Sequence, residues 1–94
     1  MPASSEAQTT ATLPSDVDLH ARPAAAFVRA AMAFEASVTI AADDREADAK
    51  SLLSVLALGA KAGTSVTLRA DGPDAARAVD TLGELIAGLV ETPG

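Results

Sequence analysis

The sequence contains no cysteine, no tryptophan and no tyrosine, and it has one histidine among 94 residues. Without cysteine, a disulfide framework, a thiolate nucleophile and a thiolate metal site are all excluded. One histidine and scattered carboxylates argue against a zinc site built from protein ligands alone. We therefore expect this chain to bind no metal and no cofactor of its own.

Clusters of basic residues and long apolar runs are missing as well. The seven Lys and Arg residues are scattered and the formal net charge is −6, so nothing is suited to binding a nucleic-acid backbone. No apolar run approaches about 18 residues, which argues against a membrane span, and the first ten residues do not resemble a signal peptide. We expect a cytoplasmic monomer whose acidic surface favours partners with basic docking faces.

The length suits one small domain. Residues 1–10 are small and polar without periodicity, which predicts a disordered tail ahead of a domain spanning residues 11–94. Alternating or β-branched segments predict strands, and apolar residues at helical spacing predict helices. The expected strands cover residues 11–19, 36–41, 46–49 and 64–70, and the expected helices cover residues 24–34, 52–58 and about 75–90.

Each expected helix has one apolar stripe, which it must bury against another layer. The stripes comprise Ala24, Phe27, Val28, Ala31 and Phe34 in the first helix, Leu52, Val55 and Leu56 in the second, and Val79, Leu82, Ile86, Leu89 and Val90 in the third. The order β-α-β-β-α-β-α then predicts an α+β fold. We expect an open-faced β-sandwich, in which a four-stranded antiparallel sheet carries three helices on one face.

The sole histidine is the strongest candidate for chemistry. An imidazole is a good nucleophile that is available near neutral pH. Because Pro23 is tolerated in the first turn of a helix, His20 and Ala21 are expected at a helix N-terminus. The amide groups there favour a phosphoryl group, and Arg22 supplies a planar cation suited to phosphate oxygens. A lone histidine can equally be an exposed or capping residue.

Two segments together resemble a known family. Residues 19–25, Leu-His-Ala-Arg-Pro-Ala-Ala, resemble the active-site signature of HPr, the histidine-containing phosphocarrier of the phosphoenolpyruvate-dependent sugar phosphotransferase system. Residues 50–59, Lys-Ser-Leu-Leu-Ser-Val-Leu-Ala-Leu-Gly, resemble the second signature of that family at the expected distance. The resemblance covers about residues 10–90 and includes the order of the predicted elements.

The resemblance implies that the chain is a stoichiometric phosphoryl-transfer relay and not an enzyme. His20 would accept a phosphoryl group on Nδ1 from enzyme I, which requires Mg²⁺, and would pass it to IIA domains of sugar permeases. Arg22 would help to hold the phosphoryl group. Ser51 would match the serine that HPr kinase/phosphorylase modifies in some bacteria, although Ser51 is also a good helix N-cap without modification.

The resemblance also implies a docking face for these partners. Leu52, Leu53 and Leu56 cannot all point inward on one helix, so we expect some of them on an exposed apolar surface. Ala21 and Arg29 are expected on the same face, although Arg29 is also explained as a solvated helix charge.

One residue departs from the family pattern, and other functions stay open. Asp18 stands where the family usually has glycine before the Leu-His pair. It tolerates a left-handed φ better than most residues, but its charge would oppose an incoming phosphate. The alternatives are a carrier of the nitrogen-linked phosphotransferase branch, an HPr-like domain of a dihydroxyacetone-kinase system, and a non-catalytic HPr-fold corepressor module. A hydrolase is disfavoured, because Asp18 is the only acid or base candidate near His20.

Overall fold

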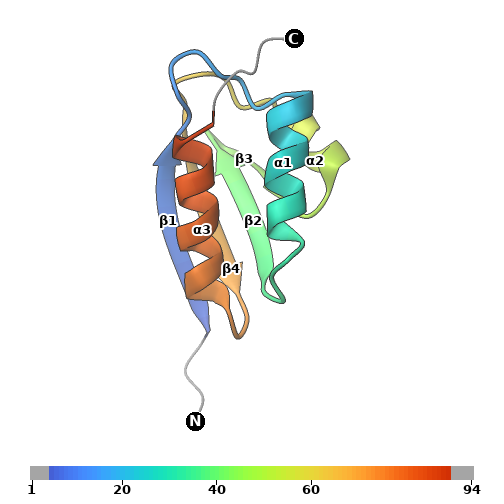
Figure 1. Ribbon diagram of the computed structural model, residues 1–94, viewed down its shortest axis with the longest axis vertical. Helices are drawn as coiled ribbons and strands as arrows, with labels where there is room; N and C mark the ends of the chain where they lie inside the picture. Colours follow the sequence, from blue (N-terminus) through green and yellow to red (C-terminus); the bar gives the residue numbers. More distant parts are fainter. Residues whose placement is uncertain (1–4, 90–94) are drawn as a thin grey trace.

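The computed structural model describes residues 5–89, which form four strands and three helices (Figure 1). In chain order these are β1 (Glu6–Thr12), α1 (Ala21–Ala31), β2 (Ser37–Ala42), β3 (Arg45–Asp48), α2 (Leu52–Leu58), β4 (Ser65–Asp71) and α3 (Ala75–Ala87). The strands form one sheet in the order β1-β4-β2-β3, and each neighbouring pair is antiparallel. The predicted element order and fold class are confirmed.

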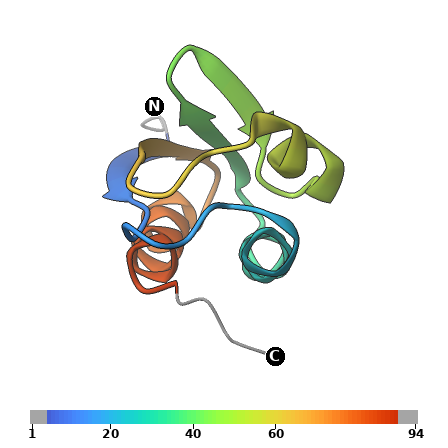
Figure 2. The same ribbon diagram turned by 90° about the horizontal axis from the view of Figure 1, so that it is seen from above.

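One face of the sheet is covered by helices and the other faces solvent (Figure 2). Successive side chains of a strand point to opposite faces. In β2, Val38 and Ile40 are buried while Ser37 is exposed, and in β4, Val66 and Leu68 are buried while Arg69 is exposed. These alternating, β-branched segments therefore supply the floor of the core.

The helices complete the core from the covered side. Phe27 in α1 is the largest fully buried side chain, and α1 also buries Pro23, Ala24, Val28 and Ala31. The predicted stripe of α3 is confirmed for Val79, Leu82 and Ile86. Leu89 is partly buried, and Val90 lies outside the described residues. Within residues 5–89, no helix is long and apolar enough to cross a membrane.

The predictions for the first strand and the tail are wrong in their boundaries. Strand β1 covers Glu6–Thr12, so residues 6–10 belong to the sheet; residues 1–4 lie outside the described part of the chain. All seven residues of β1 pair with β4, from Glu6 opposite Asp71 to Thr12 opposite Ser65. Backbone pairing with a distant strand, and not an apolar side-chain pattern, makes this segment a strand. It ends before Pro14, which cannot donate to a ladder.

The starts of the first two helices are placed as predicted. Helix α1 begins at Ala21 with His20 as its N-cap, which confirms that Pro23 lies in the first turn, although the expected apolar stripe began only at Ala24. It ends at Ala31, so Phe34 lies beyond the helix and is partly buried. Helix α2 begins after Ser51 and ends at Gly59, whose φ of 63° is left-handed.

The inward face of α2 differs from the prediction. Its buried residues are Val55 and Leu58, while Leu56 is only partly buried against the core. Leu52 was expected to point inward, but its side chain is 40% exposed. The helix has only seven residues, which is about two turns, so a small change in its rotation decides which leucine reaches the core.

The corner between β4 and α3 is tied to the start of β2. Gly72 has a φ of 153°, and a Cβ there would lie 2.6 Å from the Cα of Ala36. The carboxylate of Asp74 accepts hydrogen bonds from the backbone N–H of Glu35 and of Ala36, both at 2.9 Å. These bonds, chiefly the one from Glu35, hold the pKa of Asp74 below its ordinary value, against partial desolvation.

Candidate functional site

His20 is the N-cap residue of α1 and its side chain is exposed. Its backbone is extended, with a φ of −108°, and its carbonyl accepts the first helical hydrogen bond from the Ala24 N–H at 2.7 Å. The ring makes no capping hydrogen bond to the helix. The cap is therefore made by the backbone of His20, and the imidazole is presented to solvent at the start of the helix.

The chain on either side of His20 is firmly anchored. Leu19 is 1% exposed, and its N–H donates to the carbonyl of Ala60 at 2.9 Å. Pro23 and Ala24, in the first turn of α1, are buried as well. Two buried anchors therefore fix the backbone from which the His20 side chain projects, and a rigid support of this kind favours chemistry at that side chain.

Two further predicted residues lie beside His20. Ala21 and Arg22 are exposed in the first turn of α1, and both contribute amide groups to the positive end of the helix dipole. Helix N-termini attract phosphate groups, and a guanidinium binds phosphate oxygens in a forked geometry. In residues 5–89 there is no group of three or more His, Cys, Asp or Glu side chains that could hold a metal ion.

Asp18 does not adopt the left-handed backbone that its place in the pattern suggested. Among the described residues other than glycine, Asp43 alone has a positive φ. The carboxylate of Asp18 instead accepts a hydrogen bond from the Ala62 N–H at 2.7 Å. A tolerance for left-handed φ is therefore not the reason for aspartate at this position.

Ser51 caps α2 but does not lie next to His20 along that helix. Its hydroxyl accepts a hydrogen bond from the Ser54 N–H at 3.3 Å, so the predicted N-cap is confirmed. The opposite end of α2 leads to Ala60, whose carbonyl accepts from Leu19. Because seven helical residues rise about 10 Å, the length of α2 separates Ser51 from the segment that anchors His20.

The exposed large apolar side chains of the described residues lie at the C-terminal end of α1 and in the first turn of α2. They are Leu53 at 81% exposed, Met32 at 64% and Leu52 at 40%. The hydrogen bond from Lys50 Nζ to the Phe34 carbonyl, 2.7 Å long, ties the start of α2 to the chain just after α1. Of the three leucines that the resemblance placed on a docking face, Leu52 and Leu53 are exposed and Leu56 is partly buried, and their role in docking stays a prediction. Met32 was missed, because it lies outside the apolar stripe of the expected helix and carries no motif.

The charge is unevenly distributed around this surface. Residues 20–34 and 49–61, which contain α1 and α2, hold four basic residues and no acidic residue. The basic residues are Arg22, Arg29, Lys50 and Lys61. All thirteen acidic residues lie elsewhere in the chain, so these two segments are basic although the chain as a whole is acidic.

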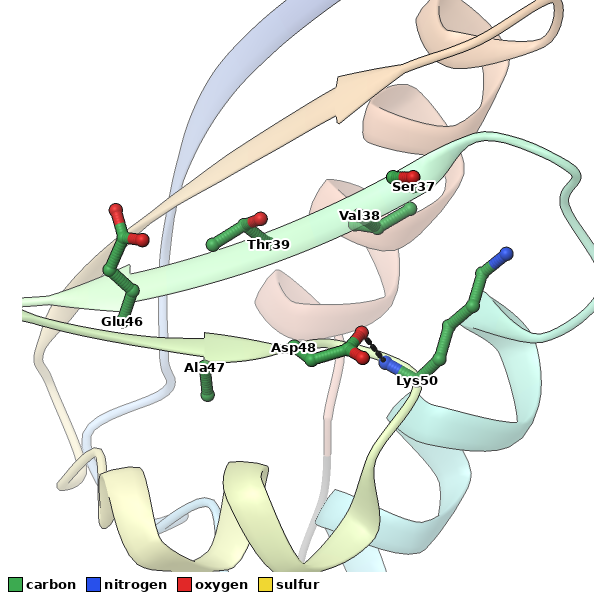
Figure 3. A pocket seen from close by; sticks show the side chains of 7 residues that line it. All are labelled: Ser37, Val38, Thr39, Glu46, Ala47, Asp48 and Lys50. Atoms are coloured by element: carbon green, nitrogen blue, oxygen red, sulfur yellow. Dashed lines mark hydrogen bonds between the residues drawn. The ribbon is translucent and has the colours of Figure 1, made fainter.

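A separate hollow of about 340 Å³ lies along β2 and β3 (Figure 3). It is lined by Ser37, Val38, Thr39, Glu46, Ala47, Asp48 and Lys50, and Asp48 accepts a hydrogen bond from the Lys50 N–H within it. The two carboxylates disfavour an anion. This hollow is therefore not a second phosphate site.

Comparisons with known proteins agree with this geometry. The model of the family described as "PTS HPr component phosphorylation site" matches residues 7–88. Phosphocarrier protein HPr of Streptomyces coelicolor is 49% identical over 77 residues, which cover 80% of this chain and 83% of that protein. The corresponding protein of Vibrio cholerae is 47% identical over 71 residues, which cover 76% and 84%.

Solved structures of HPr proteins are also similar to this chain. The crystal structure of a phosphocarrier protein HPr from Bacillus anthracis is 31% identical and has a TM-score of 0.82. The aligned region covers 86% of this chain and 96% of the Bacillus anthracis chain. With the family model matching nearly the whole described chain, the protein belongs to the HPr family of phosphocarrier proteins, which relay phosphoryl groups and are not enzymes.

Proposed function

We propose that this chain works in the cytoplasm as a monomer, taking a phosphoryl group on His20 from enzyme I and passing it to IIA domains of sugar permeases. The observation that carries the proposal is the exposed imidazole of His20 between two buried anchors, at a helix N-terminus beside Arg22. Phosphoenolpyruvate is the original donor, and Mg²⁺ serves enzyme I and not this chain.

The transfer step is an in-line displacement at phosphorus. The lone pair of the His20 ring nitrogen, Nδ1 in our proposal, forms the new N–P bond while the bond between phosphorus and the donor breaks. Little covalent chemistry is needed, so positioning and charge stabilisation decide the rate. The guanidinium of Arg22 and the amide groups of the first turn of α1 face the charge on the phosphoryl oxygens.

The exposed apolar surface formed by Met32 and the start of α2 specifies the character of the partners. The apolar residues Leu52, Leu53 and Met32 are accompanied by four basic residues on α1, α2 and their flanks. Such a surface fits a partner with an apolar centre and an acidic rim. The net charge of the chain predicted partners with basic faces, whereas the basic residues of α1, α2 and their flanks favour partners with acidic faces.

Ser51 is proposed as a regulatory site that acts through this surface. Phosphorylation by HPr kinase/phosphorylase would add about −1.5 to −2 charges at pH 7. At the start of α2 that charge is tolerated by the helix, but it stands next in sequence to Leu52 and Leu53. An acidic partner would then be repelled, while the fold would remain intact.

The test of the proposed function is phosphorylation by phosphoenolpyruvate, Mg²⁺ and enzyme I. Wild type is expected to gain one acid-labile, base-stable phosphate, and His20→Ala is expected to gain none. Because the ring is exposed and does not cap α1, His20→Ala should keep the wild-type far-UV circular dichroism. Labelling of folded His20→Ala, or no labelling of wild type, would contradict the proposal.

Arg22→Lys separates the shape of the guanidinium from its charge. Lysine keeps the charge but loses the planar fork. We expect transfer to slow by roughly 10-fold, which is the size of effect expected when one hydrogen-bond donor to the phosphoryl oxygens is weakened. Arg22→Ala should be slower still. Rates are measured by rapid quench from phosphorylated enzyme I, with melting curves as the control for folding. Wild-type rates in Arg22→Ala would remove Arg22 from the site.

A further inference from the structure

The loop that leads into His20 is held against the loop that follows α2. Residues 13–20 and 59–64 lie side by side in both views of the molecule (Figures 1 and 2). Backbone hydrogen bonds join Leu13 N–H to the Thr64 carbonyl at 2.9 Å and Gly63 N–H to the Pro14 carbonyl at 3.0 Å. The two loops therefore form one unit.

Nearest to His20, a side chain completes this connection. Asp18 Oδ1 accepts from the Ala62 N–H at 2.7 Å in a part-buried position, across 44 residues of sequence. The Leu19 N–H donates to the Ala60 carbonyl, and the His20 N–H donates to the Asp18 carbonyl at 2.9 Å. Asp18, Leu19 and His20 are thus each held by a hydrogen bond.

A glycine at this position could not make the side-chain contact, so the aspartate adds a restraint. A hydrogen bond to an ionised group is stronger than one between neutral groups, and a part-buried one is less weakened by solvent. Phosphoryl transfer depends on placement, since a shift of about 1 Å at a reacting group can cost on the order of 100-fold in rate.

We propose that Asp18 is a positioning residue for phosphoryl transfer, and that its hydrogen bond to Ala62 N–H holds the His20 backbone in the geometry from which the ring reacts. The inference depends on the proposed transfer function of His20. It competes with a simple electrostatic account, in which the Asp18 carboxylate only repels the incoming phosphoryl group.

Two substitutions at Asp18 distinguish these accounts. Asp18→Asn removes the charge but keeps an oxygen that accepts from the Ala62 N–H, whereas Asp18→Ala removes both. Under our proposal, Asp18→Ala lowers kcat for transfer from enzyme I by about 10-fold with little change in KM, and Asp18→Asn retains most of kcat. Under repulsion alone, both variants transfer faster than wild type. Asp16→Ala is the matched control, because it removes an exposed carboxylate from the same loop.

A second measurement needs no phosphoryl donor and so separates this inference from the proposed function. In Asp18→Ala, amide exchange of Ala62 should accelerate by about 10-fold, and the His20 ring resonances should shift or broaden, while Asp16→Ala should match wild type in both. Asp18→Gly provides the same comparison if Asp18→Ala does not fold. Wild-type kcat or faster transfer in folded Asp18→Ala, or unchanged Ala62 exchange and His20 resonances, would overturn the proposal.

Discussion

Leu53 is 81% exposed, more than any other large apolar side chain in the described part of the chain. Full burial of a leucine side chain is favourable by about 1.5–3 kcal/mol. Because Leu53 is mostly exposed in the free protein, most of this free energy contributes to binding when a partner covers it. Alanine retains part of the apolar surface. Leu53→Ala should therefore weaken the complex with enzyme I by about 1–2 kcal/mol, which corresponds to roughly 5- to 30-fold in affinity.

The assay is calorimetric titration of unphosphorylated enzyme I, with KM for phosphotransfer measured beside it. The free energy of unfolding should change by less than about 0.5 kcal/mol, because an exposed side chain adds little to the folded state. Leu53→Met is the control that keeps apolar bulk, and it should retain wild-type affinity.

Two outcomes would contradict this role for Leu53. If Leu53→Ala binds enzyme I as tightly as wild type, the apolar surface on α1 and α2 is not the docking surface for that partner. If Leu53→Met weakens binding as much as Leu53→Ala, buried apolar area does not explain the contribution of this residue, and a contact of specific shape must replace it.

Substitutions at Ser51, Gly72 and Asp74 test the proposed regulation and the packing and charge of the fold. Ser51→Ala should lose about 1 kcal/mol of stability with its cap and transfer normally, while Ser51→Asp should raise KM for enzyme I without lowering Tm; an unchanged KM would leave Ser51 as a helix cap only. Gly72→Ala should cost about 3 kcal/mol in urea unfolding, since its Cβ would lie 2.6 Å from Ala36 Cα. The control Gly63→Ala, with open space around it, should cost about 1 kcal/mol, and equal losses would refute the packing argument. The stabilisation by ionised Asp74 is complete above the ordinary carboxyl pKa and is lost as pH falls through its lowered pKa in the folded protein. The Tm difference between wild type and Asp74→Asn should therefore be constant near neutral pH and shrink as the pH falls below about 4, the ordinary carboxyl pKa, and a difference that stays constant there would contradict the role given to ionised Asp74.

The placement of His20, Arg22 and Ser51 at the starts of helices was predictable because its signals are local. Pro23 marks the first turn of a helix, which places His20 and Arg22 at the helix N-terminus whatever the rest of the chain does. Ser51 and Gly59 are the residue types that begin and end a helix, and α2 lies between them as expected. Each of these signals depends on neighbours within about four residues.

The features that were missed depend on partners far away in the sequence. Strand β1 has almost no apolar pattern and exists because it pairs with β4, more than fifty residues later. The exposure of Leu52 depends on how α2 packs, which its sequence leaves open among three leucines. Local propensity is a weak guide where tertiary pairing and packing decide the structure.

The sequence by itself thus placed its one histidine, our proposed phosphoryl acceptor, at the start of a helix, because capping and helix start are short-range properties. Only the tertiary structure decided how His20 is held and what surrounds it. The hydrogen bond between Asp18 and Ala62 spans 44 residues, and the grouping of Met32 with the leucines of α2 follows from two helices meeting on one side of a sheet. Such contacts form because the chain buries its apolar face as a whole, and no window of neighbouring residues contains that information.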